Sequence, residues 1–155
     1  MSSWSKTRTV LLGLLSTALV LTGTAANAAK LVGQNLTQLI TQSESIISGT
    51  VKEVIDGIDD AGVPFTQVTI SVHSVAKGKN KVLEAQDYTF RQFGLLIPRT
   101  MENGHKLLAL APEGFARWNE GETVVAFMYK PASRTGLQTT AGMAQGKLSL
   151  VNGML

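Results

Sequence analysis

Alternating apolar and polar positions run through most of the chain after residue 45. In the segment 65–75, FTQVTISVHSV, polar residues alternate with Val68, Ile70 and Val72, which is typical of a strand with one buried face. The segment 46–55, IISGTVKEVI, has the same period, and the turn-forming residues between the two segments predict an antiparallel pair. Val75 falls on the opposite parity from Val72, which predicts a β-bulge near Ser74.

Further strands are expected downstream. The segment 83–96 is rich in aromatic residues, and Asn103-Gly104 forms a turn that leads into another strand. The segment 123–130, TVVAFMYK, is apolar on both parities, which predicts a central strand covered on both faces. A last strand precedes the C-terminus, with Leu148 and Leu150 facing inward. We expect one interior that contains Val51, Val68, Ile70, Val72, Phe127 and Leu148.

One short helix is expected before the strands. Leu36, Leu39 and Ile40 have helical spacing, and Asn35 is a suitable N-cap. The later connections are short and rich in turn residues, so they leave no room for the helical crossovers of a parallel sheet. The sequence therefore predicts a mainly β fold, a small closed or partly open antiparallel barrel that is OB-like and has one short N-terminal helix. A β-sandwich is the alternative.

The first 28 residues have the features of a Sec signal peptide. Lys6 and Arg8 precede a long uncharged apolar run, and the small residues that a signal peptidase requires end at Ala28. We therefore expect cleavage between Ala28 and Ala29, a single β-barrel domain over residues 29–155, and export to the periplasm or the extracellular space. A retained membrane span is the alternative, and the small-residue cleavage site argues against it.

Composition and charge exclude several functions. The chain has no cysteine, so disulfides, thiol catalysis, zinc–thiolate sites and a lipoprotein anchor are excluded. It has 14 basic and 11 acidic residues, and two of the basic ones lie in the expected signal peptide, so the exported part is nearly neutral. Nucleic-acid binding needs a basic surface and stacked rings. Alternation points Tyr88 and Phe90 away from Phe93, so we expect no nucleic-acid partner.

No sequence motif indicates catalysis or metal binding. His73 and His105 are isolated from each other, and the aspartates of DGIDDAG have the spacing of a turn and not of a calcium loop. No serine lies in a nucleophile elbow. The lysines of AKGKNK, which are Lys77, Lys79 and Lys81, are interpreted as a soluble strand end. We expect no enzyme activity, no metal and no cofactor.

Four short motifs, IISGTV, VTISVHSVAKG, GETVVAF and AQGKLSL, together resemble a group of uncharacterised secreted bacterial small β-barrel proteins. The resemblance covers most of residues 46–150 and implies secretion and a small barrel. The first two strands are also similar to the opening hairpin of netrin-like domains, OB-type barrels that include tissue metalloprotease inhibitors. Those inhibitors act through a cysteine-fixed N-terminus, which this cysteine-free chain does not have.

The connection 111–122, APEGFARWNEGE, is the candidate contact surface. Phe115 and Trp118 are large rings close to Arg117, in a segment whose proline, glycine and charged residues predict exposure. Alternatively, the rings close one end of the barrel as part of its core. The sequence thus predicts an exported, non-catalytic binding module for a protein or peptide partner. The alternative is a structural or envelope-associated protein without a discrete ligand.

Overall fold

The computed structural model of the 155-residue chain describes residues 33–78, 82 and 84–151. They belong to one compact unit, Leu31–Leu155. The expected signal peptide and its cleavage site between Ala28 and Ala29 lie outside the described residues. Within the described part, no helix is long and apolar enough to cross a membrane.

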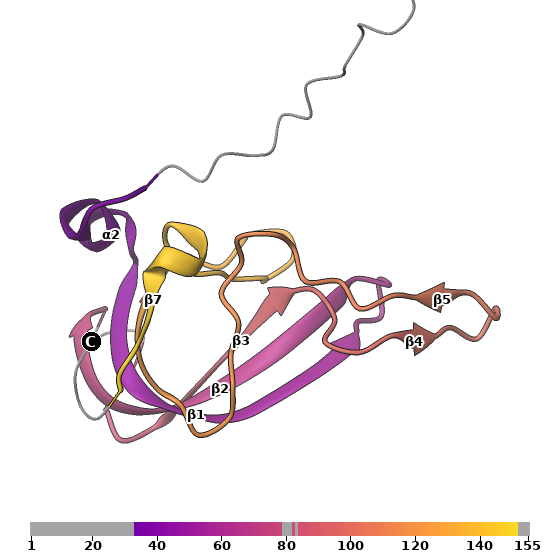
Figure 1. Ribbon diagram of the computed structural model, residues 1–155, viewed down its shortest axis with the longest axis horizontal. Coiled ribbons are helices and arrows are strands. Elements are labelled where there is room, and N and C mark those ends of the chain that lie inside the picture. The colour runs from indigo at the N-terminus through magenta and orange to yellow at the C-terminus, as the bar shows by residue number, and fades with distance from the viewer. Residues whose placement is uncertain (1–32, 79–81, 83, 152–155) are drawn as a thin grey trace, which may run out of the picture. The chain divides into compact units, whose positions relative to one another are not determined.

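A five-stranded antiparallel sheet forms the centre of the fold, with strand order β3-β2-β1-β6-β7 (Figure 1). Its strands are β1 (Ser45–Ile58), β2 (Pro64–Lys77), β3 (Asp87–Phe93), β6 (Thr123–Met128) and β7 (Lys147–Ser149). The expected mainly β, antiparallel fold with one short N-terminal helix is confirmed. Among the described residues no sheet is closed into a barrel, because β3 and β7 are edge strands that do not pair with each other. The expectation of a closed barrel is therefore wrong for this sheet, which is open.

Strands β1 and β2 are bent by irregular pairing. Ser48 pairs with Ser74 while Gly49 pairs with Val72, so one extra residue is accommodated in β2 between these partners. The bulge predicted near Ser74 is thereby confirmed, and such bulges bend a strand and increase its twist. At this bend the two strands come so close that a Cβ atom on Gly49 would lie 2.3 Å from the carbonyl oxygen of Ser71. Only glycine fits there.

Helix α2 (Leu36–Gln42) has the N-cap that the sequence predicts. The side chain of Asn35 accepts a hydrogen bond from the backbone N–H of Gln38, and the Gln38 side chain accepts one from the Asn35 N–H. Near the other end of the helix, Lys77 Nζ donates to the carbonyl oxygen of Ile40 at 2.8 Å. Lys77 thus ties the end of β2 to α2, whereas Lys79 and Lys81 lie outside the described residues.

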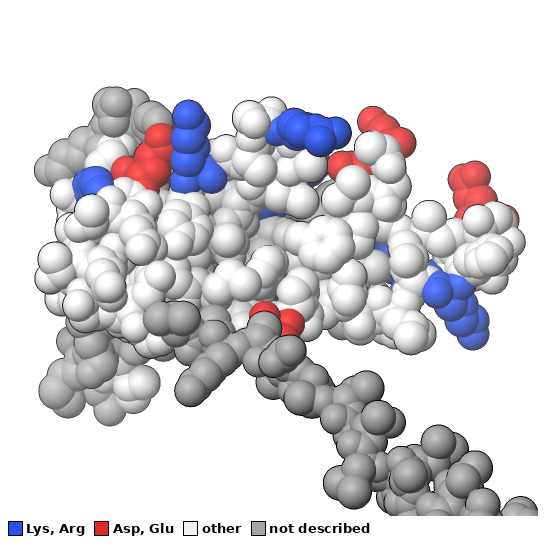
Figure 2. Space-filling view, turned by 90° about the horizontal axis from the view of Figure 1, so that it is seen from above, with Lys and Arg blue, Asp and Glu red and all other residues white. Residues whose placement is uncertain are grey.

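A two-stranded arm, defined as residues 95–110, extends beyond the end of β1 and β2 (Figure 1). It contains β4 (Arg99–Thr100) and β5 (Lys106–Leu107), so the strand predicted after the Asn103-Gly104 turn is only two residues long and belongs to a separate sheet. The end of the arm carries both a basic and an acidic side chain (Figure 2).

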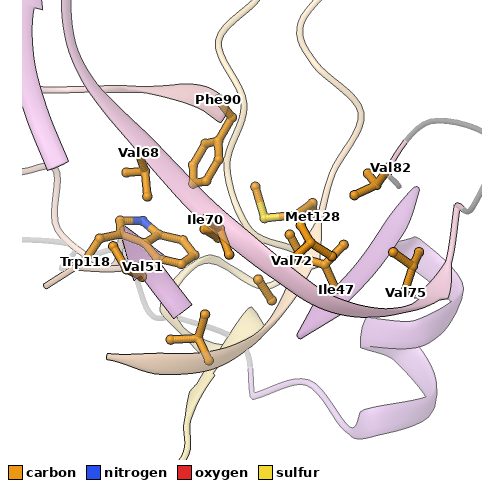
Figure 3. Packing of buried hydrophobic residues seen from close by; sticks show 13 residues of the cluster. Ile47, Val51, Val68, Ile70, Val72, Val75, Val82, Phe90, Trp118 and Met128 are labelled. Carbon is orange, nitrogen blue, oxygen red and sulfur yellow. The ribbon is translucent and has the colours of Figure 1, made fainter. Parts of the chain in front are cut away.

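The main hydrophobic core lies on one face of the sheet (Figure 3). Four of the predicted core residues are at most 1% exposed and belong to it: Val51, Val68, Ile70 and Val72. Figure 3 shows Trp118 and Val51 at the opposite end of this cluster from Val75 and Val82. The β1 and β2 part of the predicted interior is therefore confirmed.

The opposite face of the sheet has its own small core, which corrects the prediction of a single interior. Phe127 belongs to a second cluster with Leu39 of α2, and Leu148 packs against that cluster. Strand β6 alternates between the two, since Met128 is buried in the main core and Phe127 under α2. The prediction that β6 is covered on both faces is confirmed, but a strand with both parities apolar does not reveal which side holds the main core.

Candidate functional site

Hydrogen bonds hold the predicted contact segment, residues 111–122, in place. Gln92 Nε2 donates to the carbonyl oxygen of Ala116 at 3.1 Å, and Lys147 Nζ donates to that of Arg117 at 2.6 Å. The backbone N–H of Ala144 donates to the carbonyl oxygen of Gly114 at 2.7 Å. The segment is thus fixed against β3, β7 and the 3₁₀ helix η1 (Met143–Gly146).

The three predicted site residues point to different environments. Ala116 and Trp118 are buried in the main core, Phe115 is half-buried on the other side of the segment, and Arg117 is exposed. The expected exposure of Trp118 is wrong, because the segment alternates inward and outward like a strand despite its polar neighbours. The alternative, in which this ring belongs to the core, agrees with the structure.

Trp118 is held in the core by specific contacts as well as by its size. Its ring is 6% exposed and meets Phe90 edge to face, with 5.3 Å between the ring centroids. Its Nε1–H donates to Gln92 Oε1 at 3.4 Å. Lys147 Nζ lies 5.3 Å from the ring centroid, within the range of a cation–π interaction.

Phe115 lines a pocket of about 630 Å³, here called the aromatic pocket. Its apolar lining residues are Phe93, Phe115, Tyr129, Ala132 and Leu137, and its polar lining residues are Gln42, Ser43, Glu44, Lys130, Gln138 and Thr139. Three aromatic residues therefore line an open space that also has hydrogen-bonding groups at its margin. This combination is typical of ligand sites in proteins.

Two of the three rings reach the pocket by strand alternation. Tyr88 and Phe90 belong to the main core or pack against it, with 5.9 Å between their ring centroids, whereas Phe93 lines the pocket. Tyr129 follows Met128 at the end of β6 and so points away from the main core. The sequence pattern indicated that Phe93 diverges from Tyr88 and Phe90, but it gave no signal that Phe93 and Tyr129 would meet.

Gln138 connects the walls of the pocket. Its side chain is buried, accepts a hydrogen bond from the Tyr88 hydroxyl at 2.8 Å and donates one to the carbonyl oxygen of Tyr129 at 2.6 Å. Its backbone N–H donates to the carbonyl oxygen of Arg91 at 2.7 Å. Burial raises the pKa of Tyr88, so its hydroxyl remains a neutral donor. Gln138 thereby links β3 to the end of β6.

One polar group in the pocket wall is left without a partner. Thr139 Oγ1 is buried and has no hydrogen-bond partner among the described residues. Tyr129, in contrast, has its hydroxyl occupied, since it donates to Gln42 Oε1 at 2.9 Å and accepts from the Gly142 N–H at 3.4 Å. The Thr139 hydroxyl is thus a buried polar group in this wall that the described residues leave unsatisfied.

The other residues considered for chemistry have local roles. The carboxylate of Asp59 accepts from the N–H groups of Ala61 and Val63, which is the turn geometry that the sequence predicts. His73 is exposed and lies 3.4 Å from Thr50 Oγ1 through its Nε2 atom. Within the described residues, no group of three or more histidine, aspartate or glutamate side chains could hold a metal ion.

Asp56 has a structural role that the sequence did not suggest. Its carboxylate accepts hydrogen bonds from the N–H groups of Leu96 and Ile97 at 2.7 and 3.0 Å, and it pairs with Arg99 at 2.5 Å. Burial acts to raise the pKa of Asp56, but the hydrogen bonds from Arg99, Ile97 and Leu96 outweigh it and lower this pKa below its ordinary value. Asp56 therefore fastens the arm to β1.

Comparison with known proteins gives no relative. No family model, no curated protein and no solved structure matches this chain. A function for the protein must accordingly be argued from its own residues.

Proposed function

We propose that this protein is an exported, non-catalytic binding module that recognises a protein or peptide partner through the aromatic pocket. The observation that carries the proposal is an open pocket of about 630 Å³ whose lining includes the rings of Phe93, Phe115 and Tyr129. Binding pockets of this size are lined mainly by apolar and aromatic side chains, with a few polar groups that fix orientation. An apolar side chain of the partner is the group that suits such walls.

The polar margin of the pocket supports a peptide as the ligand. Two polar side chains that line the pocket are exposed, Gln42 and Lys130. A peptide presents backbone N–H and C=O groups next to each side chain, so these groups can face the polar margin while an apolar side chain fills the pocket.

Rigidity of the pocket walls also favours binding. Phe115 lies on a segment whose neighbours bond to β3, β7 and η1, and Tyr129 is bonded through its hydroxyl to Gln42. Gln138 joins the edge of β3 to the end of β6, which supports an OB-like, partly open barrel as the scaffold of the site. A preformed site loses little conformational freedom when the ligand binds.

Peptide binding tests this function directly. Fluorescence anisotropy would be measured with labelled peptides of constant flanks whose central residue is Phe, Leu or Asp. We expect Phe-centred and Leu-centred peptides to bind with a Kd of about 1–100 μM, and the Asp-centred peptide to bind at least about tenfold more weakly. The variant Phe115→Ala removes one ring and should lower the affinity about tenfold or more.

Leu36→Ala is the matched control, because Leu36 is 57% exposed on α2 and does not line the pocket. This variant should bind as the wild type does. Equal affinity for all three peptides, or equal affinity of the Phe115→Ala and Leu36→Ala variants, would contradict the proposed function. Export is tested separately by N-terminal sequencing of the secreted or periplasmic protein, which should begin at Ala29.

A further inference from the structure

The arm of residues 95–110 carries a second candidate surface, distinct from the aromatic pocket. Four aliphatic side chains on it are strongly exposed: Leu96 by 52%, Ile97 by 58%, Leu108 by 73% and Leu110 by 43%. We call them the arm patch. They are half of the exposed large hydrophobic residues in the described part of the chain, although the arm is a small fraction of it.

The pairing of the two arm strands explains why these side chains face solvent. Leu95 pairs with Leu110 and Arg99 pairs with Leu107, so three residues on one strand lie opposite two on the other. Regular alternation cannot be kept across such a mismatch. The aliphatic side chains of both strands are therefore exposed together, and they are held there by the bonds from Asp56 to Leu96, Ile97 and Arg99.

This surface is unusual for a chain that stays monomeric. Four half-exposed aliphatic side chains amount to roughly 400 Å² of apolar area, which is the scale of a functional patch. In addition, β4 and β5 pair only with each other among the described residues, so their outer edges have backbone groups available for another strand. Both features are those of a surface that is covered by another molecule.

We propose that the arm patch docks on the arm patch of a second copy of this chain. The patch is entirely aliphatic, which suits the more apolar interfaces of homodimers. Glu102 and Lys106 are exposed on either side of the arm's Asn103-Gly104 turn and have opposite charges. A twofold axis through the patch can therefore bring Glu102 of one copy near Lys106 of the other. A membrane surface would instead select tryptophan and a cluster of free lysine and arginine side chains, whereas the arm has no tryptophan and its Arg99 is paired with Asp56.

The size of the patch sets the expected strength of the dimer. A standard interface buries about 800 Å² on each partner, and the arm patch supplies roughly half of this. Pairing of the exposed strand edges and contacts of the charged arm end add to it. The dimer is therefore expected to form in the micromolar range and to exchange with monomer.

Sedimentation equilibrium of protein purified from cells that express the full chain tests the proposal. From about 5 to about 200 μM, a range that brackets a micromolar Kd, the wild type should shift from monomer to dimer. Leu108→Asp should remain monomeric over this range and keep the wild-type melting temperature, because Leu108 is 73% exposed. Leu36→Asp, an equal change at an exposed leucine on α2, should dimerise as the wild type does.

Single-cysteine variants give a second readout, since the chain has no cysteine of its own. Under mild oxidation Leu108→Cys should form a disulfide-linked dimer faster than Leu36→Cys does. A wild type that is monomeric at the highest concentration, or a Leu108→Asp variant that dimerises normally, would overturn the proposal. Sedimentation of the wild type with phosphatidylglycerol vesicles, lost in Leu108→Asp, would assign the patch to a membrane surface and overturn it as well.

Discussion

Lys147 Nζ lies 2.6 Å from Glu122 Oε1, and the two side chains are only 9% and 17% exposed. The pair joins the start of β7 to the turn before β6. It also fixes the segment of Phe115 and Trp118, because Lys147 bonds to the carbonyl oxygen of Arg117. The motifs GETVVAF and AQGKLSL, which stood apart in the sequence, are thus connected by their charged residues.

Lys147→Met should destabilise the protein by about 3 kcal/mol, because it leaves the carboxylate of Glu122 mostly buried without its cation. Lys52→Met is the control, since Lys52 pairs with Asp87 at the same 2.6 Å but with 60% and 44% exposure. Breaking that exposed pair should leave the stability nearly unchanged, because solvent screens the two charges. Urea denaturation of both variants measures the difference, and equal losses would show that burial of the Glu122 pair has no effect.

Trp118→Ala should destabilise the protein by about 3–5 kcal/mol, because the ring is buried against Phe90 and its removal leaves a cavity. Phe115→Ala removes a half-buried ring from the same segment. It should cost about 1–2 kcal/mol, since less buried apolar area is lost than in Trp118→Ala. Urea midpoints at constant slope provide the comparison. A Trp118→Ala variant as stable as the wild type would contradict the conclusion that this ring is part of the core.

The two cores can be separated by additivity. Ile70→Ala and Phe127→Ala should each cost about 2–5 kcal/mol, because the two side chains are buried in different clusters on opposite faces of the sheet. In the double variant the losses should add to within about 0.5 kcal/mol. Denaturant unfolding of the four proteins measures this. A coupling above about 1 kcal/mol would mean that the two side chains share one interior.

Local features of this fold were predictable because their causes are local. Asn35 stands where an N-cap is needed, and the change of parity between Val72 and Val75 requires an extra residue in the strand. Phe127 was placed in the wrong core because both parities of β6 are apolar. The choice of face depends on where α2 packs, and the strand's own residues contain no information about that.

The candidate site was only partly predictable for a related reason. Arg117 and Glu120 suggested an exposed segment, but the hydrogen bonds from Gln92 and Lys147 hold it in an extended, alternating conformation that buries Trp118. Phe115 was found from sequence because a large ring among polar residues is conspicuous. Phe93 and Tyr129 were not, because they belong to parts of the sheet that are not neighbours, and they line one pocket only where Gln138 bridges β3 and the end of β6.

Attachment of the arm should depend on pH through Asp56. Its pKa in the folded protein is below the ordinary value of 3.8, so the folded state is stabilised while the carboxylate is charged. This contribution is complete above the unfolded pKa of about 4 and is lost as the pH falls through the lower, folded pKa. Part of the wild-type stability should therefore disappear below about pH 4.

Asp56→Asn should remove that part of the acid dependence and cost about 1–3 kcal/mol at pH 7, because Arg99 and the N–H groups of Leu96 and Ile97 lose a charged acceptor. Urea denaturation from pH 7 to pH 2 measures both effects, with Asp60→Asn in the exposed loop as the control.

Amide hydrogen exchange shows whether the lost stability comes from the attachment of the arm. Leu96 and Ile97 should exchange faster in Asp56→Asn at pH 7, and unchanged protection of these two amides would show that Asp56 does not hold the arm.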